Sequence, residues 1–572
     1  MQSWRPRALT GAAFLLAAVM LFARLGELPL IDPDEGRNAE VAREMAESGA
    51  WVVPVYNAIP YLDKPALYFR VVALSFGAFG RSETTARLPS ALSAAALVVL
   101  MFAFCRREYG ERAAALAVVV LATTPLVLGF GRLVIFDMLL TVFMCLAILA
   151  GYRAEENEGP ARRWWLLLGA AASAVATLVK GPVGFLVPGA VLAAWSLVER
   201  RPRAILRMLA PVNLLVFLGI ALPWFAALAY AHPDFIHYGL VEETLRRYLT
   251  TKLRRTEPIY YYAPVLLVAL YPWSALLPEG VVAAWRSRAR WTRADRFFIV
   301  WSAMVVVFFS TSQSKRPGYV LPGVVALAVL IGRLLDHALA RPDGRAARLV
   351  LRGTVGVAIL SVAAAGALSL NLAGPDRLQA LLDFESNEFG RLQSDIGMLV
   401  AVLAGVTVAA LAARLWRDVR LALMVFVLPA ALFLSVGFGT AARYAEASSS
   451  RGLARAMGPL PPGSRVACVE CFAVGLPFYV GQPVVYITER GRGGLTSNYV
   501  RYRLQRDDNW PPVLVHLEDR SRWLESQTGP VYLLAKDHSH PFLEDVARAR
   551  GVPVTTLRPG WWGALIPPPT RS

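Results

Sequence analysis

Long apolar stretches recur along the chain from near the N-terminus to about residue 438. Each covers roughly 16 to 25 residues, and a helix of about 20 residues crosses the roughly 30 Å hydrocarbon core of a bilayer. The pattern therefore predicts thirteen membrane-spanning helices, which would place the two chain ends on opposite sides of the membrane. These helices are expected at residues 8–26, 88–104, 113–130, 137–152, 164–179, 182–198, 208–230, 259–283, 296–311, 318–335, 348–371, 395–413 and 420–438.

The first polar segment opens with "IDPDEGRNAEVAREMAESG", residues 31–49, which has the pattern of a short amphipathic helix. Asp32 is expected to be its N-cap, with Pro33 in the first turn and Glu35 completing a capping box. Gly49 is expected to end it. The helix would place Val41, Ala42, Met45 and Ala46 on an apolar side, opposite Glu40, Arg43, Glu44 and Glu47. Such a helix is suited to lie on a membrane surface.

The remaining polar segments complete the expected domain organisation. The first external loop, residues 27–87, contains a second expected surface helix at 64–80, and the loop at 231–258 has the length of a lid or binding loop. Residues 1–439 are expected to form an all-α, polytopic transmembrane domain, and residues 440–572 a soluble α/β domain. Its strands are expected at 465–470, 483–487, 530–536 and 553–559, and its helices near 450–458, 474–479, 519–526 and 541–550.

Composition and charge agree with this pattern. The 572 residues are 56% hydrophobic and 17% charged, and the mean hydropathy is +0.46, which excludes an ordinary soluble enzyme. Cytoplasmic loops collect Lys and Arg, so the N-terminus is expected in the cytoplasm, and the first loop and the C-terminal domain in the periplasm. The loops behind this orientation are "CRREYGER", "ERRPR", "RSRARWTRADR", "ARPDGRAARLVLR" and "RLWRDVR". No motif for nucleic-acid binding accompanies the net charge of +18.

Some cations are expected on the external side, against this rule. They are Arg37, Lys64, Lys180 and the basic stretches at 246–255 and 312–319. Cations held there, close to the membrane, indicate anionic ligands such as lipid phosphates. For any single one of these residues, solvation or pairing with a nearby carboxylate is an equally good explanation.

Two acids are candidates for chemistry. Asp34 is not needed by the capping pattern around it, and Asp137 starts the fourth expected span, where an ionisable group is costly unless it is paired or functional. The structural alternative for Asp137 is a helix-start acid or a salt bridge to Arg132. Lys64 and Arg37, the latter one helical turn from Asp34, would suit a phosphate leaving group, although Lys64 also fits a lysine at the membrane interface.

Cofactor signals are weak. The chain lacks a G-x-S-x-G motif, a Walker loop, a dinucleotide-binding glycine pattern and H-E-x-x-H. No cofactor is predicted with certainty; a divalent cation is left open because His232 and His237 lie near candidate acids, and its ligands stay unknown. The "CVEC" pair, Cys468 and Cys471, suits a strained local disulfide in an oxidising compartment, whereas a redox or zinc role lacks partner residues in the sequence; Cys105 and Cys145 suit a packing role.

Four stretches in the same order resemble those of the large bacterial lipid-donor glycosyltransferases of the GT-C fold. They are similar above all to the 4-amino-4-deoxy-L-arabinose transferases that modify lipid A. The stretches are "DPDEGRNAEVAREM", "GAWVVPVYNAIPYLDKPALYF", "SETTARLPSAL" and "FSTSQSKRPGYVLPGVVALAVL". The resemblance spans the membrane part, and the C-terminal domain has only a general likeness.

The resemblance implies roles for individual residues. The family's catalytic acids fall on Asp34, with Glu35 as its neighbour in the "DE" motif, and on Asp137. Its other motif positions fall on Asp63, Lys64, Ser314, Lys315 and Tyr319. Together with the basic loops, the residues expected to bind substrate phosphate are Lys64, Arg37, Arg246, Arg247, Lys315 and Tyr319. Asp34 would orient the attacking phosphate, steer the sugar amine or hold a cation, and the sequence does not rank these roles.

The implied function is transfer of aminoarabinose from undecaprenyl phosphate to a lipid A phosphate at the periplasmic face of the inner membrane. On family grounds, inversion by direct displacement is expected. The donor lipid, lipid A and membrane lipids are the expected partners. Two alternatives stay open: a protein O-mannosyltransferase-like enzyme that uses a polyprenyl-phosphate sugar, and a transporter of lipid-linked sugars. Transporters commonly contain internal repeats, and this chain shows none.

Overall fold

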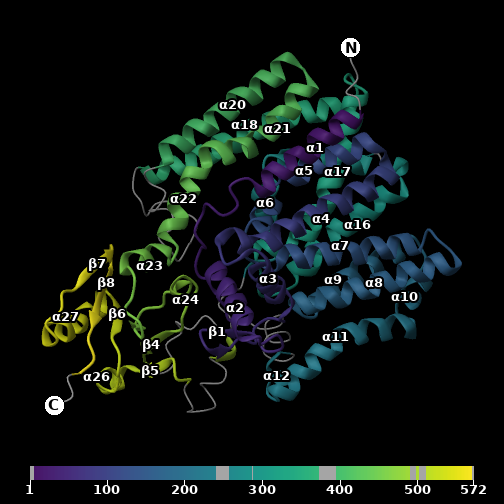
Figure 1. The fold of residues 1–572 in the computed structure, drawn as a ribbon. Coiled ribbons are helices and arrows are strands. Elements are labelled where there is room, and N and C mark those ends of the chain that lie inside the picture. The colour runs from purple at the N-terminus through teal and green to yellow at the C-terminus, as the bar shows by residue number, and fades with distance from the viewer. Residues whose placement is uncertain are drawn as a thin grey trace. The chain divides into compact units, whose positions relative to one another are not determined.

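The computed structural model describes residues 6–239, 257–286, 288–372, 395–489, 498–500 and 511–569. The chain divides into two compact units (Figure 1). The first comprises Met1–Leu25, Ser90–Pro223 and Thr244–Tyr444, and the second Gly26–Pro89, Trp224–Glu243 and Ala445–Ser572. The second unit therefore joins residues 26–89 to the C-terminal segment. The expected division into domains 1–439 and 440–572, which follows chain order, remains a prediction.

The first unit consists of helices. They are α1 Pro6–Phe22, α4 Glu83–Tyr109, α5 Glu111–Thr123, α6 Pro125–Gly131, α7 Asp137–Ala154, α8 Gly159–Lys180, α9 Val183–Val198, α10 Arg203–Met208, α11 Pro211–Ala231, α14 Tyr262–Ala269, α15 Leu277–Arg286, α16 Arg293–Ser310, α17 Leu321–Ala340, α18 Arg345–Leu372, α20 Ile396–Trp416, α21 Val419–Leu432 and α22 Phe438–Ala447. The first turns of α4, the end of α11 and the end of α22 belong to the second unit.

Within the described residues, seven helices are long and apolar enough to cross a membrane, or nine if each of two bent pairs counts as one span. The bent pairs are α5 with α6 and α14 with the helical segment Trp273–Arg286. The chain is therefore a mostly helical, multi-pass membrane protein with a C-terminal sheet. The expected count of thirteen spans is not confirmed.

Small residues let the helices of the first unit pack closely. Gly332 of α17 lies so near α5 that an added Cβ would be 2.6 Å from the backbone nitrogen of Ala117. Aromatic side chains fill the wider gaps: Trp273 stacks on Phe426 at 5.0 Å between ring centroids and donates its indole N–H to Thr123 at 3.0 Å. Close backbone approach and satisfied polar groups are what helix packing in a membrane requires.

The second unit has short helices around a six-stranded sheet with the order β5-β4-β3-β6-β8-β7. Its elements are α2 Asp34–Ser48, β1 Val55–Tyr56, β2 Ile59–Pro60, α3 Leu67–Phe79, α12 Phe235–His237, α23 Arg451–Met457, β3 Arg465–Val469, α24 Leu476–Val480, β4 Val484–Thr488, β5 Leu514–His516, α26 Arg520–Glu525, β6 Val531–Lys536, α27 His540–Ala549, β7 Thr555–Arg558 and β8 Trp561–Ile566. Neighbours among β5, β4, β3 and β6 pair in parallel, whereas β8 and β7 are antiparallel.

Most expected elements of the C-terminal sheet are confirmed. The four expected strands correspond to β3, β4, β6 and β7, and the four expected helices to α23, α24, α26 and α27. A hydrophobic cluster lies on each face of the sheet, so the central strands are buried on both sides and read as continuous apolar runs. The sequence prediction missed β5, which has three residues, and β8, whose "WWGALI" lacks regular alternation.

The capping box expected at the start of α2 is wrong. The N-cap residue is Pro33, and no side chain caps the helix. The Asp32 carboxyl instead accepts the hydroxyl hydrogen bond of Ser450, from far along the chain. Glu35 does reach back, because its carboxylate accepts the backbone N–H of Ile31 at 3.0 Å. The backbone N–H of Asp32 donates to the carbonyl of Ser448 at 3.0 Å, so neither bond of the predicted capping box is present.

The expected polar face of α2 is also wrong in part. Arg43 forms two 2.7 Å hydrogen bonds to Glu40, and both side chains are buried. The ion pair lets both enter a region that the amphipathic pattern assigned to water. Gly49 ends the helix as predicted, with a φ of 68°. The helix is thus enclosed by its unit on more than its apolar side.

Candidate active site

Asp34 is the first residue of α2, and its side chain is 42% exposed. The guanidinium of Arg37, one helical turn on, donates to its carboxylate and also lies 5.6 Å from the ring centroid of Tyr61. Helical spacing alone brings the two side chains together, as the sequence predicted. An accessible acid and a mostly enclosed base therefore stand side by side at the start of this helix.

Asp63 and Lys64 follow in the same unit. The Asp63 carboxylate accepts the hydroxyl of Tyr238 at 2.7 Å and the backbone N–H groups of Asn498 and Tyr499, both at 2.8 Å. The ammonium of Lys64 donates to the Asp63 carbonyl at 2.6 Å. Asp63 is buried and ties three separate segments together, so it fixes the backbone from which the half-buried Lys64 extends.

Asp137 lies in the first unit, at the first residue of α7. Its buried carboxylate accepts the ammonium of Lys180, the last residue of α8, at 2.6 Å. The salt bridge to Arg132 considered from the sequence is replaced by this one, because Arg132 donates to the carbonyls of Met20 and Ala23 at 2.8 and 2.7 Å. The sequence placed Lys180 among the cations that indicate anionic ligands, but it did not predict the pairing with Asp137.

Lys315 and Tyr319 have different environments within the first unit. The ammonium of the buried Lys315 donates to the carbonyls of Glu257 and Ser312, both at 2.7 Å, and so holds its own loop. The ring of Tyr319 instead lies 4.9 Å from the ammonium of Lys180, which also sits 4.8 Å from the Phe136 ring. Asp137, Lys180 and Tyr319 therefore form one cluster, and Lys315 supports the loop that leads to it.

Other predicted positions contribute less to the described site. Arg246 and Arg247 lie outside the described residues. His232 contacts the ring of Tyr499 edge-on at 6.4 Å, and no group of three or more His, Cys, Asp or Glu side chains in the described part of the chain is arranged to hold a metal ion. Cys468 and Cys471 are free, buried thiols in the core beneath the sheet, not a disulfide.

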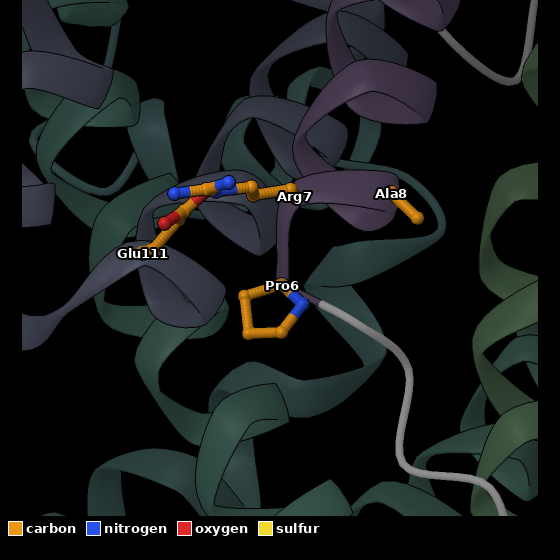
Figure 2. Close-up of a pocket in the computed structure, with 4 residues that line it drawn as sticks. All are labelled: Pro6, Arg7, Ala8 and Glu111. Carbon is orange, nitrogen blue, oxygen red and sulfur yellow. The ribbon is translucent and has the colours of Figure 1, made fainter.

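A surface pocket elsewhere in the first unit contains none of these residues. Figure 2 shows its lining at the start of α1 and α5, formed by Pro6, Arg7, Ala8 and Glu111. Thr10 donates to the Glu111 carboxylate at 3.2 Å beside it. The candidate chemistry therefore depends on the two side-chain clusters, with Asp34 in one unit and Asp137 in the other.

Known proteins resemble this chain over different lengths. A family model described as dolichyl-phosphate-mannose-protein mannosyltransferase matches residues 63–226. The undecaprenyl phosphate-alpha-4-amino-4-deoxy-L-arabinose arabinosyl transferase of Edwardsiella ictaluri is 31% identical over 59% of this chain. That match spans only 61% of the relative's own length. The protein of the same name from Enterobacter sp. is 29% identical over 71% of this chain and 73% of its own.

A solved structure extends the similarity to nearly the whole chain. ArnT from Cupriavidus metallidurans, in its crystal structure bound to undecaprenyl phosphate, matches with a TM-score of 0.79 and 25% identity. The match covers 97% of this chain and 98% of that one. Together with the order of the motifs, these matches make the chain similar to ArnT-like GT-C glycosyltransferases, over part of its length in sequence and over nearly all of it in fold.

Proposed function

We propose that this protein transfers 4-amino-4-deoxy-L-arabinose from undecaprenyl phosphate to a phosphate of lipid A. The observation that carries this proposal is the match along 97% of the chain to an ArnT structure that holds undecaprenyl phosphate. The names of the curated relatives specify the same donor. The lipid A acceptor, the inner membrane and the periplasmic location of the reaction are parts of the proposal, which follow from that family.

The acceptor chemistry suits the side chains of α2. A lipid A phosphate is already an anionic nucleophile, so it needs much less general-base help than a sugar or protein hydroxyl. Asp34, exposed and hydrogen-bonded to Arg37, orients the attacking phosphate through a shared proton or holds the sugar amine. Glu35 lies on the buried side of the helix. There it fixes the start of α2, which holds Asp34 in place, and it does not contact substrate.

The leaving group is the phosphate of undecaprenyl phosphate, and the reaction needs positive charge to stabilise it. In the second unit, Lys64 and Arg37 supply that charge; in the first, Lys180 and the Tyr319 hydroxyl are the groups suited to a phosphate. Fixed cations in a region drier than bulk water stabilise such charge strongly. Direct displacement at the sugar carbon would break its bond to the donor phosphate oxygen and form one to the acceptor phosphate oxygen, with inversion.

The finer topology is part of the proposal. Four further helices, α1, α8, α9 and α16, coincide with expected spans and add to the nine counted above. With them the chain has thirteen spans, a cytoplasmic N-terminus and a periplasmic C-terminal domain. Alkaline phosphatase fused after residue 569 should be active, and the same enzyme fused in the loop at 199–203 should be inactive.

A protein O-mannosyltransferase-like activity is the second candidate, favoured by the family model over residues 63–226. In that case Asp34 would be a true general base for a Ser or Thr hydroxyl. Acceptor labelling separates the two: radiolabelled sugar from the donor should appear in lipid A and not in protein. A transporter of lipid-linked sugars, the third alternative, would form no glycosylated product from donor and acceptor in detergent.

The decisive experiment compares lipid A by mass spectrometry in cells that express the wild type or Asp34→Asn. We expect a pentosamine-sized addition with the wild type and none with the variant. Asp519→Asn is the matched control, because Asp519 is 45% exposed and also pairs with an arginine three residues on, Arg522 at 3.2 Å. Equal modification with wild type and Asp34→Asn contradicts the assignment, and no addition with the wild type contradicts the function.

No cofactor is required by these steps, and a divalent cation remains a separate question. Purified protein treated with a chelator, exchanged into metal-free buffer and assayed with and without added Mg²⁺, Mn²⁺ or Zn²⁺ tests it. Unchanged turnover without metal supports the simpler mechanism. Loss of turnover without metal and its recovery with one added ion would show that the mechanism uses that ion.

A further inference from the structure

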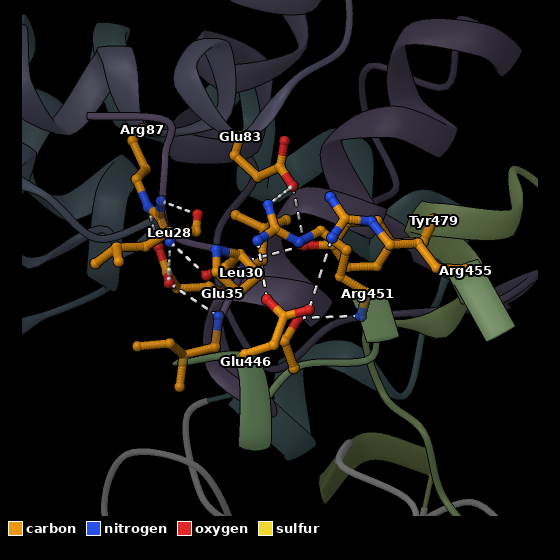
Figure 3. Close-up of polar contacts among 12 residues, drawn as sticks. Leu28, Leu30, Glu35, Glu83, Arg87, Glu446, Arg451, Arg455 and Tyr479 are labelled. Atoms are coloured by element: carbon orange, nitrogen blue, oxygen red, sulfur yellow. Dashed lines mark hydrogen bonds and ion pairs between the residues drawn. The ribbon is translucent and has the colours of Figure 1, made fainter. Parts of the chain in front are cut away.

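Arg87 is a fully enclosed arginine near the start of α4, and its guanidinium contacts one continuous segment of chain (Figure 3). Its Nε and Nη2 donate to the two carboxylate oxygens of Glu35 at 2.9 and 2.8 Å. Nη1 donates to the carbonyl of Leu28 at 2.6 Å, and Nη2 also to that of Pro29 at 2.9 Å. One side chain therefore binds both the segment that enters α2 and the second residue of that helix.

Glu35 completes the connection. One of its carboxylate oxygens accepts the backbone N–H of Ile31 at 3.0 Å as well as the guanidinium of Arg87. The side chains of Glu35 and Arg87 are 4% and 2% exposed. A bidentate, buried arginine–carboxylate pair has one well-defined geometry, and its bonds are stronger than those of an exposed pair. Arg87 and Glu35 thus close residues 28–35 into one hydrogen-bonded loop.

This geometry sets the rotation of α2 about its own axis. Consecutive residues of an α-helix with 3.6 residues per turn are about 100° apart, so the neighbours Asp34 and Glu35 point in different directions. Glu35 is anchored inward on Arg87, whereas the Asp34 side chain is 42% exposed. Rotation that released Glu35 from Arg87 would carry Asp34 and Arg37 away from their present direction.

We propose that Arg87 is a positioning residue for Asp34, acting through Glu35 and the carbonyls of Leu28 and Pro29. The proposal rests on the transferase function proposed above. Arg87 touches no reacting atom in it. Its task is to hold the start of α2 so that the Asp34 carboxylate meets the substrates in one orientation, and small displacements of such a group reduce turnover strongly.

Arg451 is a second arginine of this unit, and it reaches residues 28–35 only indirectly: Tyr479 donates to its partner Glu83 at 3.4 Å and accepts the backbone N–H of Leu30 at 2.9 Å. Arg451 pairs with Glu83 at 3.2 Å and Glu446 at 2.9 Å, in a cluster completed by Arg455 and Tyr479 (Figure 3). Arg81 and Phe478 line a surface pocket beside it. Glu83 lies on α4, as Arg87 does, but Arg451 has no hydrogen bond to residues 28–35 in the described structure that would orient Asp34. Replacement of Arg451 therefore tests the loss of a half-buried arginine–carboxylate pair that has no direct bond to residues 28–35.

The experiment measures turnover of purified full-length protein with undecaprenyl-phosphate aminoarabinose and lipid A. Arg87→Lys keeps the charge but loses the bidentate fork, so kcat should fall at least tenfold while KM for the donor stays within twofold. Arg451→Lys should stay within twofold in both. The double variant Glu35→Gln/Arg87→Gln removes both charges, leaves no unpaired buried ion, and should also lose at least tenfold in kcat.

Hydrogen exchange gives a readout independent of activity. Backbone amides in peptides covering residues 28–38 should exchange faster in Arg87→Lys than in either the wild type or Arg451→Lys. A kcat of Arg87→Lys and of the double variant within twofold of wild type overturns the proposal, as does unchanged exchange. A wild type that forms no product overturns the transferase function instead, and the exchange result then still decides whether Arg87 holds α2.

Discussion

The ammonium of Lys180 lies 2.6 Å from the carboxylate of Asp137, and the two side chains are 14% and 6% exposed. The pair joins the end of α8 to the start of α7, 43 residues apart in sequence. Breaking a buried pair by removing one partner leaves an uncompensated charge and costs about 3–5 kcal/mol. Lys180 therefore holds the Asp137 side chain in place, and its removal leaves a buried carboxylate without this partner.

Lys180→Met should reduce both the stability of the protein and its turnover, the latter at least tenfold. Lys180→Arg should retain more activity than Lys180→Met, because it keeps a cation beside Asp137 and Tyr319. Thermal melting in detergent and kcat on purified protein measure the two effects. Lys536→Met is the control, since Lys536 also lies over an aromatic ring, 4.8 Å from the centroid of Trp561, but belongs to neither acidic cluster. Wild-type turnover by Lys180→Met would exclude a role for the pair.

Lys64→Ala should lower turnover about 100- to 1,000-fold through loss of a cation at the leaving phosphate, an electrostatic effect of the size seen for single oxyanion-stabilising donors. Its ammonium donates to the adjacent Asp63 carbonyl, and the side chain is half-buried. The melting temperature should change much less than the turnover. Steady-state kinetics with the polyprenyl-phosphate donor test this, and unchanged kcat and KM would remove Lys64 from the site.

Lys315→Met should have the opposite profile, with a clear loss of stability. The buried Lys315 ammonium donates to two backbone carbonyls, of Glu257 and Ser312, and the variant leaves both acceptors without that donor. Each buried polar group left without a hydrogen-bond partner lowers the free energy of unfolding by about 1–3 kcal/mol. A melting temperature equal to that of the wild type would show that Lys315 does not hold the loop, and would restore it as a candidate phosphate ligand.

The sequence predicted those parts of the site that depend on neighbours within one or two helical turns. The Asp34–Arg37 pair and the Gly49 helix end follow from helical spacing and from glycine's freedom at positive φ. The apolar stretches predicted the helices equally well, because the length of an apolar run is itself the signal for a span.

The partners that came from far along the chain could not be predicted. Asp32 has the pattern of an N-cap, yet its carboxyl bonds Ser450, which is 418 residues away. Glu35 finds Arg87 at a separation of 52 residues. A single sequence does not show which distant residues come into contact. The capping pattern uses only nearby residues, so it predicted that these acids bond the backbone N–H groups at the start of α2. The burial of Glu40 with Arg43 was missed for the same reason: pattern rules send charges to water unless a partner is known.

The last prediction concerns Asp32 and pH. Burial raises the pKa of Asp32 from 3.8 to about 6. The hydrogen bond from Ser450 lowers this pKa, but its effect is smaller than that of burial. The carboxyl lies between Gly36 and Gly475, where an added Cβ on either glycine would overlap with it. The enclosed protonated form is thus favoured in the folded protein over a wider pH range than in the unfolded chain.

Because the folded state holds this proton more tightly, the stability it contributes is complete below pH 3.8 and is lost as pH rises through about 6. At about 1.4 kcal/mol per pH unit, the loss amounts to at most about 3 kcal/mol. Asp32→Asn, which stays neutral, should lose less stability than the wild type between pH 4 and 6.5. Melting temperatures in detergent across this range measure the difference, with Asp519→Asn as control. Parallel curves for wild type and Asp32→Asn would show that Asp32 titrates normally.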